Sequence, residues 1–199
     1  MIQPFDEGRT LQAWQRFVNI GELMPYIPAP VARSWFRCKN RGQLAVQLLP
    51  GQLPKEPGSV EPGITLSKAF QQTFTLLTPF LRLEELLLAL VDPRGVLQEW
   101  QGTHRFIVGG SLQKGMLLQE ETLGTMAIGL ALKEKNTFFV RGAEHYCSCY
   151  HQVASFAAPI MKQNECLGFL AGWTALSAGS LAAVAVSLGK QVLESYCIS

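Results

Sequence analysis

The stretch from Glu120 to Ile160 constrains the fold of this chain more than any other part of the sequence. Its first piece, residues 120–132, predicts a capped helix, because Thr122 and Thr125 can place hydroxyls over free amides at the helix start. One face of this helix carries small residues and can therefore lie close against a sheet: Gly124, Ala127 and Ala131.

Two predicted strands and a polar loop follow this helix. Residues 138–146 begin as a β-branched and aromatic strand that breaks at Gly142. Residues 156–160 form an apolar strand in which Pro159 must occupy an edge or a bulge, because proline has no N–H to donate. The loop between them, residues 144–151, is polar, aromatic and rich in cysteine. A helix start, a strand end and such a loop together predict a pocket wall.

The rest of the sheet is predicted from tight turns. A continuous apolar run at 86–91, a turn at 92–95 with proline in its second position and a strand at 96–100 form a hairpin, expected at the sheet centre. A second tight turn at 163–165 leads into a last strand at 167–174. Strands joined in this way pair antiparallel, so the pattern predicts a central antiparallel sheet of about six strands.

Helices precede and follow these strands. Apolar spacing predicts helices over residues 10–24, 31–39 and 66–83 and again from about residue 177, where one side carries Leu181, Val184, Leu188 and Val192. The predicted class is α+β, with terminal helices on one sheet face and shorter helices and loops on the other. We expect two parts: an N-terminal helical segment with a Pro/Gly-rich connector over 1–62, and the sheet-containing domain with its terminal helix over 63–199. The excess apolar surface of the terminal helices predicts a homodimer that forms through them.

Composition excludes several classes of protein. The 199 residues are 48% hydrophobic, which suffices for a sizeable core, and 17 basic against 15 acidic residues leave a net charge of +2 that does not suggest nucleic-acid binding. The N-terminus does not resemble a signal peptide, and no apolar run approaches the roughly 20 residues that cross a bilayer. An odd number of cysteines, five, favours reduced thiols. We therefore expect a cytoplasmic protein without membrane contact.

Five segments in order resemble the GAF domain at the N-terminus of sigma-54-dependent bacterial transcription activators, the group that includes acetoin and glycerol-metabolism regulators. They are residues 34–38 (SWFRC), 90–97 (LVDPRGVL), 124–132 (GTMAIGLAL), 140–146 (VRGAEHY) and 157–160 (AAPI). The sequence departs from the family pattern at Met126, where asparagine is usual, and at residues 153–155 and 171–174 around the expected pocket.

The resemblance implies a GAF-like sensory domain that binds a small molecule or a partner protein and thereby regulates transcription. No phosphate-binding loop or helix-turn-helix is visible after residue 140. The ATPase and DNA-binding modules of such activators are therefore not expected in this chain, and neither is direct contact with nucleic acid. The sequence leaves open which ligand is bound and whether the natural protein continues into those modules.

The expected ligand site lies between the helix start, the neighbouring strands and the 144–151 loop. His145 is expected to donate to a ligand carbonyl or carboxylate, and Glu121 either caps free amides or meets the ligand. Amides near Thr125 could hold a small anion, as helix N-termini do. The complete set of expected ligand-binding residues is Trp100, Phe106, Met116, Leu118, Glu121, Thr125, Phe139, His145, Tyr146, Tyr150 and Phe156.

The loop also raises other possibilities. His145, Cys147, Cys149 and His151 are metal-ligand residue types. Neither a strand nor a helix would bring four residues with this spacing to one point, and only a loop could gather them. We therefore expect no metal or other cofactor. The pair Cys147 and Cys149 allows a second hypothesis, a thiol enzyme of the methionine sulfoxide reductase type. A third is a protein-docking domain with a vestigial pocket. The favoured interpretation is a sensor that is not an enzyme.

Overall fold

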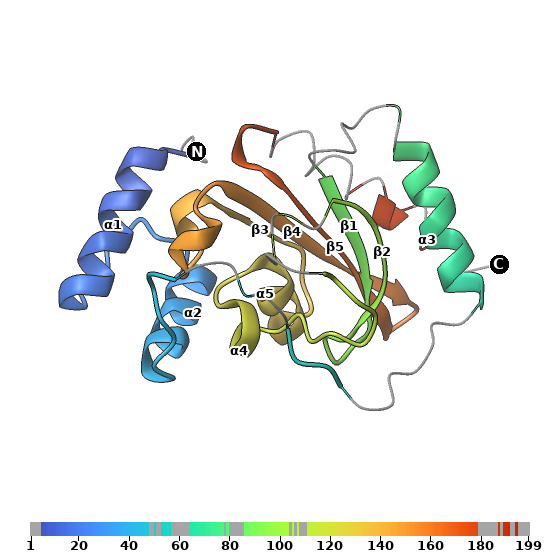
Figure 1. The fold of residues 1–199 in the computed structure, drawn as a ribbon, viewed down its shortest axis with the longest axis horizontal. Helices are drawn as coiled ribbons and strands as arrows, with labels where there is room; N and C mark the ends of the chain where they lie inside the picture. The colour runs from blue at the N-terminus through green and yellow to red at the C-terminus, as the bar shows by residue number, and fades with distance from the viewer. Residues whose placement is uncertain are drawn as a thin grey trace.

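The computed structural model describes residues 5–47, 50, 53–56, 64–77, 79, 86–103, 105, 107, 111–178, 187, 189–191 and 194. Its main elements are α1 (Glu7–Ile20), α2 (Ala29–Asn40), α3 (Ile64–Leu77), β1 (Leu86–Val91), β2 (Leu97–Gly102), α4 (Glu120–Leu123), α5 (Ala127–Glu134), β3 (Phe138–Arg141), β4 (Val153–Lys162) and β5 (Glu165–Ala175). Short 3₁₀ helices are η3 (Gly142–Glu144), η4 (Ser148–Tyr150) and η5 (Leu176–Ala178). Figure 1 shows the sheet between α5 and α3, with α1 and α2 at the left-hand end.

The described strands form one antiparallel sheet of five strands in the order β2-β1-β5-β4-β3. The α+β class and the antiparallel sheet predicted from the sequence are therefore confirmed. The hairpin of β1 and β2 exists, but β2 is an edge strand, so the hairpin lies at one side of the sheet and the prediction of a central hairpin was wrong.

The turn between β1 and β2 forms for a local reason. The Asp92 carboxylate accepts hydrogen bonds from the backbone N–H groups of Arg94 (2.8 Å) and Val96 (2.9 Å). Gly95 takes a φ of +93°, a conformation that glycine adopts without steric cost. An aspartate that holds its own turn explains why this short segment was predicted correctly.

Pro159 lies within β4, opposite Phe169 of β5. The other neighbour of β4, the strand β3, reaches only to Ala157, so β4 has no strand on that side at Pro159. A register shift follows directly after Ile160. Proline therefore sits where the strand has become an edge, as its missing N–H requires.

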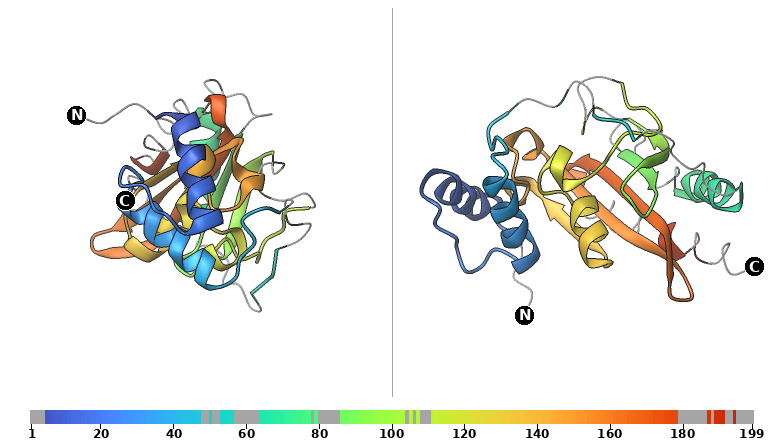
Figure 2. Two further views of the ribbon diagram at one scale, coloured as in Figure 1. Left: turned by 90° about the vertical axis from the view of Figure 1, so that its left-hand side faces the viewer. Right: turned by 90° about the horizontal axis from the view of Figure 1, so that it is seen from below.

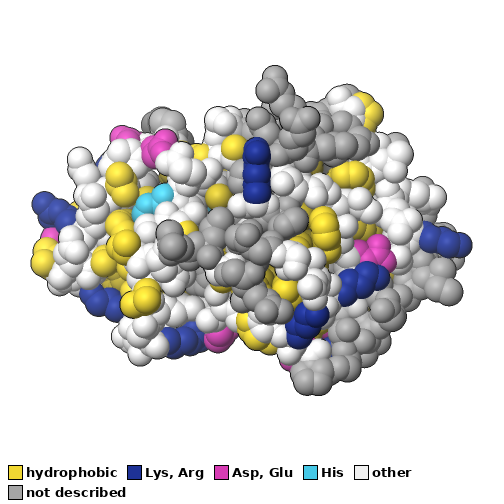
Figure 3. Space-filling view, viewed as in Figure 1, with side chains coloured by type: hydrophobic (Ala, Val, Ile, Leu, Met, Phe, Trp, Pro, Cys, Tyr) yellow, Lys and Arg dark blue, Asp and Glu magenta, His cyan; other side chains and the backbone are white. Residues whose placement is uncertain are grey.

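The two faces of the sheet have separate cores. On one face, Ala69 and Phe70 of α3 lie in one buried cluster with Leu86, Leu88 and Leu90 of β1. On the other, the buried residues of α5 join a larger cluster that includes Leu87, Phe169 and Trp173. All six residues of β1 are buried, which is why that strand is a continuous apolar run. In Figure 1 and in the right-hand view of Figure 2, α1 and α2 lie at one end of the sheet and α3 at the other. On the face drawn in Figure 3, apolar and charged side chains are interspersed.

The predicted helix over residues 120–132 is two helices. Gly124, with φ +73° and ψ −156°, ends α4 in a region of backbone conformation that is essentially restricted to glycine. The helix α5 then starts at Ala127, and its Gly129 approaches the backbone of Glu120 closely enough that a Cβ there would lie 3.3 Å from it. We call residues 124–126 the elbow.

The helices α1 and α2 share the larger core cluster with the sheet. Trp14 and Phe17 of α1 and Trp35 of α2 are buried in it, so the two helices pack directly on the sheet-containing domain. The predicted boundary at residues 62 and 63 falls outside the described residues and stays a prediction. Of the C-terminal helix only residues 187, 189–191 and 194 are described, and its predicted apolar stripe falls outside them.

Replacing Gly172 by alanine should lower the free energy of unfolding by about 1–3 kcal/mol, because the new Cβ would lie 2.0 Å from the Phe156 ring and 2.9 Å from the Leu87 carbonyl oxygen. The same change at Gly8 on the exposed surface of α1 meets its nearest atom at 3.6 Å and should be neutral or stabilising by up to about 1 kcal/mol. Urea denaturation measures both values, and equal losses would contradict the packing described.

Candidate functional site

The residues expected to line one ligand site divide between the two faces of the sheet. Those in the larger cluster, on the α5 face, are Trp100, Met116, Leu118, Tyr146 and Tyr150. Phe156 and Phe139 are opposite one another in the β3–β4 ladder and belong to the smaller cluster on the α3 face. Phe106 lies outside the described residues. A single site on the α5 face therefore does not include the two phenylalanines.

His145 is completely buried, and both of its ring nitrogens are engaged by the protein. Nδ1 lies 2.9 Å from the carbonyl oxygen of Gly142, which can only accept, so Nδ1 carries the proton and donates. Nε2 therefore accepts from the Ser155 hydroxyl at 2.9 Å. Burial lowers the pKa of His145 to about 3, so the ring is neutral. In this state His145 has no ring nitrogen available for a ligand.

Ser155 links His145 to the start of α5, directly after the elbow. Its Oγ accepts a hydrogen bond from the backbone N–H of Ala127, the first residue of α5, at 3.1 Å. The start of α5 is thus capped from strand β4, which replaces the cap that the sequence predicted from Thr125. Sequence spacing offered no signal for this contact, because the two residues are 28 positions apart.

Thr125 is buried and bonded to α2 instead of to helix amides. Its Oγ1 lies 2.8 Å from Ser34 Oγ, and Ser34 donates to Glu120 Oε2 at 2.6 Å. Thr125 must therefore donate to Ser34. Cys38 Sγ approaches Thr125 Oγ1 from the other side at 3.6 Å. The anion site predicted at this helix start is in this structure filled by the protein's own side chains.

Glu120 is the centre of a buried polar cluster between α2 and α4. Its carboxylate is 1% exposed and accepts from Arg37 at 2.6 and 2.7 Å and from Arg41 at 2.9 Å, in addition to Ser34. Burial would raise the pKa of Glu120, but the hydrogen bonds from Arg37, Ser34 and Arg41 outweigh it and hold the pKa below its usual value. The carboxylate is therefore ionised and binds α2 to α4.

The neighbouring Glu121 has a different position. Its side chain is 46% exposed and pairs with Arg41 at 2.7 Å and with Lys133 at 3.6 Å. The residue therefore lies on the surface, away from the buried positions on the α5 face.

Two tryptophans attach the N-terminal helices to the segment around η3. The indole N–H of Trp14 donates to the Tyr146 carbonyl oxygen and that of Trp35 to the Glu144 carbonyl oxygen, each at 2.8 Å. Both bonds are buried. Both bonds attach α1 and α2 to residues 144–146, the segment in which the buried His145 bonds back to Gly142.

Two positions at which the sequence departs from the family pattern contact each other. The Trp173 indole N–H points at Met126 Sδ, 3.3 Å away, and both side chains are fully buried. Methionine at the elbow and tryptophan in β5 therefore fill this part of the interior together.

Cys38, Cys147 and Cys149 are free thiols, and their burial keeps them protonated. Burial raises the pKa of Cys147 to about 12, that of Cys149 to about 11 and that of Cys38 to about 11. A thiolate is the nucleophile in thiol chemistry, so these values disfavour the redox hypothesis. Within the described part of the chain, no group of three or more histidine, cysteine or acidic residues is placed to hold a metal ion.

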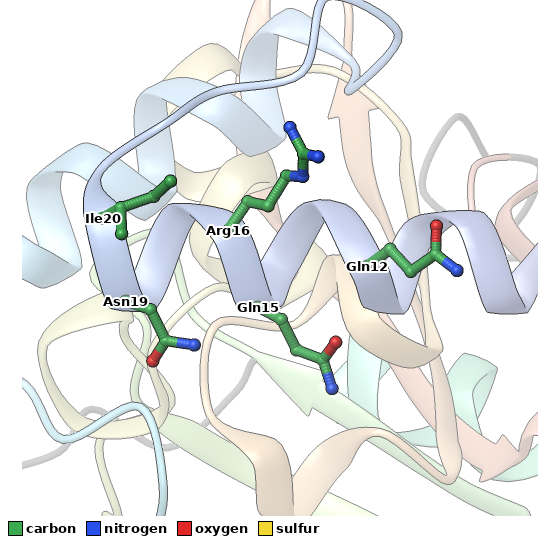
Figure 4. Close-up of a pocket in the computed structure, with 5 residues that line it drawn as sticks. All are labelled: Gln12, Gln15, Arg16, Asn19 and Ile20. Atoms are coloured by element: carbon green, nitrogen blue, oxygen red, sulfur yellow. The ribbon is translucent and has the colours of Figure 1, made fainter.

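A shallow hollow of about 350 Å³ lies on the outer side of α1. Figure 4 shows that all of its lining residues project from this one helix: Gln12, Gln15, Arg16, Asn19 and Ile20. None of them belongs to the predicted site. Among the described helices, none is long and apolar enough to cross a membrane.

A family model described as the GAF domain matches residues 65–171, more than half of the chain. This chain belongs to the GAF domain family. The GAF match covers α3, α4, α5 and the strands β1 to β4, and it reaches into β5. The family resemblance predicted from the sequence is thereby confirmed.

Proteins similar to this GAF protein include a curated relative and several solved structures. The "acetoin dehydrogenase operon transcriptional activator AcoR" of Bacillus subtilis is 28% identical over 198 residues, which are 94% of this chain and 31% of AcoR. The chain thus spans about a third of the length of that relative. The Escherichia coli DhaR(N)–DhaL complex aligns with a TM-score of 0.65 and 14% identity over 86% of this chain and 62% of that chain.

The second structure, a free methionine-R-sulfoxide reductase from Neisseria meningitidis, reaches a TM-score of 0.43 at 17% identity over 66% of this chain and 77% of that one. A likeness at this level carries no argument about chemistry.

Adjacent glutamates provide a matched test of the Glu120 cluster. Glu120→Gln should lower the free energy of unfolding by about 2 kcal/mol or more, because two arginines lose a buried charged acceptor. Glu121→Gln should cost less than about 1 kcal/mol, because its ion pairs are exposed. Urea denaturation at pH 7 compares the two, and similar small losses would show that the cluster contributes little.

His145 should make stability depend on pH. Because its folded pKa of about 3 lies below the ordinary 6.5, the unfolded chain binds one more proton between these values, and stability falls as pH drops below 6.5. Between pH 6 and 5, wild type should lose up to about 1.4 kcal/mol more per pH unit than His145→Asn, which does not titrate. Equal slopes in denaturation curves across this range would mean that the ring is not held neutral.

Proposed function

We propose that this GAF chain is the signal-receiving part of a sigma-54-type transcription activator. The observation that carries this proposal is the match to AcoR over 94% of the chain, which takes in the N-terminal helices as well as the GAF region. In this role the chain contacts a small molecule or a partner protein. DNA binding and ATP hydrolysis belong to other parts of such a regulator.

The input site we propose lies on the α5 face of the sheet. It is bordered by Trp100, Met116, Leu118, Tyr146 and Tyr150, which belong to one cluster. The Tyr150 hydroxyl donates to the Ile107 carbonyl oxygen at 3.1 Å, so the loop after β2 is joined to η4 at this place. A ligand that enters here would replace some of the contacts that these side chains make with one another.

The output we propose runs through the elbow to α2. Thr125 of the elbow is bonded to Ser34 of α2, and Ala127, directly after the elbow, is bonded to Ser155 of β4. A movement of β4 would therefore move Ala127 through Ser155, and Thr125 would pass the displacement to Ser34 of α2. A ligand that binds one arrangement of these elements more tightly shifts the population toward it.

Two parts of the proposal extend beyond the described contacts. The homodimer through terminal helices stays a prediction, in which α1 and the C-terminal helix carry the signal to a second copy. A cytoplasmic location is likewise proposed, from the role of a transcription activator.

Thermal shift assays against small polar metabolites, acetoin included, test the input site. A ligand at 100 times its Kd should stabilise the chain by about 2.7 kcal/mol, and Tyr150→Phe or Trp100→Ala should reduce that shift. Phe139→Ala, on the α3 face, is the matched control and should keep it. Equal loss in Phe139→Ala would place the site elsewhere, and the absence of a shift with every metabolite would favour a protein-docking domain.

A further inference from the structure

Residues 43–47, with the sequence Gln-Leu-Ala-Val-Gln, lie against the Cys147 loop as a segment without helix or strand that bends at residues 45 and 46; we call it the strap. Its side chains alternate between inward and outward. Leu44 and Val46 are 67% and 73% exposed, whereas Ala45 between them is 8% exposed. Opening the strap therefore removes little apolar surface from contact with the protein.

Hydrogen bonds hold the strap in place. The Gln43 amide donates to the carbonyl oxygens of Glu120 and Glu121, each at 2.9 Å. The Ala45 carbonyl oxygen accepts from the Ser148 N–H at 2.7 Å, and the Gln47 amide donates to Cys147 Sγ at 3.0 Å. A segment with few buried apolar contacts and several single hydrogen bonds is of the kind that opens locally.

Two further features lower the cost of opening. Gly42, directly before the strap, has a φ of +74°, a conformation that glycine adopts without steric cost, and no atom lies within 4 Å of the place where its Cβ would stand, so no neighbour packs against this point. Gln43 Oε1 is buried and has no hydrogen-bond partner among the described residues. A buried acceptor without a partner is unfavourable, and opening the strap returns it to water.

Cys147 lies directly under the strap. Its thiol is 1% exposed and rests on the elbow, so close that a Cβ on Gly124 would stand 2.8 Å from Sγ. Cys38 lies on α2, is fully buried, and its thiol contacts Thr125 at 3.6 Å. Its backbone carbonyl oxygen accepts from the Gln43 N–H at 3.1 Å, a backbone bond that a substitution of the Gln43 side chain leaves in place. The two thiols can therefore report separately on the strap and on α2.

We propose that the strap is a latch that opens while α2 stays docked, and that opening uncovers the Cys147 thiol and the Ser148 N–H beside the elbow. The open and closed states of the latch give the Gly124 elbow two different surroundings. This inference does not depend on the proposed function, since it requires neither a ligand nor a second module.

Alkylation by N-ethylmaleimide under native conditions, followed by peptide mass spectrometry, tests the latch. Gln43→Ala removes both of its bonds to α4 together with the unpartnered Oε1, so the loss of the two bonds is offset in part. The net effect should raise the Cys147 rate about tenfold, with the Cys38 rate unchanged. Gln72→Ala, an exposed change on α3, is the matched control and should leave both rates as in wild type.

A second measurement separates local opening from unfolding. Urea at about 1 M, below the unfolding transition, should scarcely change the Cys147 rate but should raise the Cys38 rate, because only the reaction at Cys38 requires exposure of a large buried surface. The proposal is overturned if Gln43→Ala leaves the Cys147 rate unchanged, or if Cys38 and Cys147 accelerate together in either experiment.

Discussion

The carboxylate of Glu120 connects the two halves of this molecule. It is almost completely buried at the start of α4 and is met by Arg37, Arg41 and Ser34, all from α2 or the residue after it. A buried carboxylate is tolerated only while its partners remain in place. The position of α2, and through it that of α1, therefore depends on one side chain of the GAF core. The two indole bonds to the 144–146 segment reinforce the same contact.

The elbow and the residue after it make hydrogen bonds to both α2 and β4. Gly124 bends the chain in a way other residues would resist, Thr125 is bonded to α2, and Ala127 is bonded to β4. His145 sets the direction of the Ser155 hydroxyl that makes the last of these bonds. A neutral buried histidine thus acts here as a positioning residue. The family to which the chain belongs is compatible with such a role, because a sensor must transmit a change in its core to its ends.

The parts of the fold that could be predicted depend on local interactions. Asp92 makes its own turn, and the apolar run of β1 reflects burial on both faces. The break at Gly124 was missed because small residues on both sides of it continue the helical pattern. Glu120 and Glu121 are equivalent in the sequence, and only the tertiary contact with α2 distinguishes them.

The candidate site was harder to predict for the same reason. Phe139 and Phe156 are placed on the α3 face by the register of β3 and β4, which the sequence alone did not fix. The partner of His145 Nε2 was also not predictable, because Ser155 lies ten residues later, on β4. Residue types in the loop suggested ligand chemistry, whereas the folded chain satisfies most of those groups internally.

Hydrogen exchange of the tryptophan indole N–H groups, resolved by NMR, tests most directly whether α1, α2 and the GAF core form one cooperative unit. In one cooperative unit, Trp14 and Trp35, which bond to the 144–146 segment, should exchange with the same opening free energy as Trp173 in the sheet, within about 1 kcal/mol. Exchange of Trp14 and Trp35 at an opening free energy several kcal/mol below that of Trp173 would show that the helices detach independently of the GAF core.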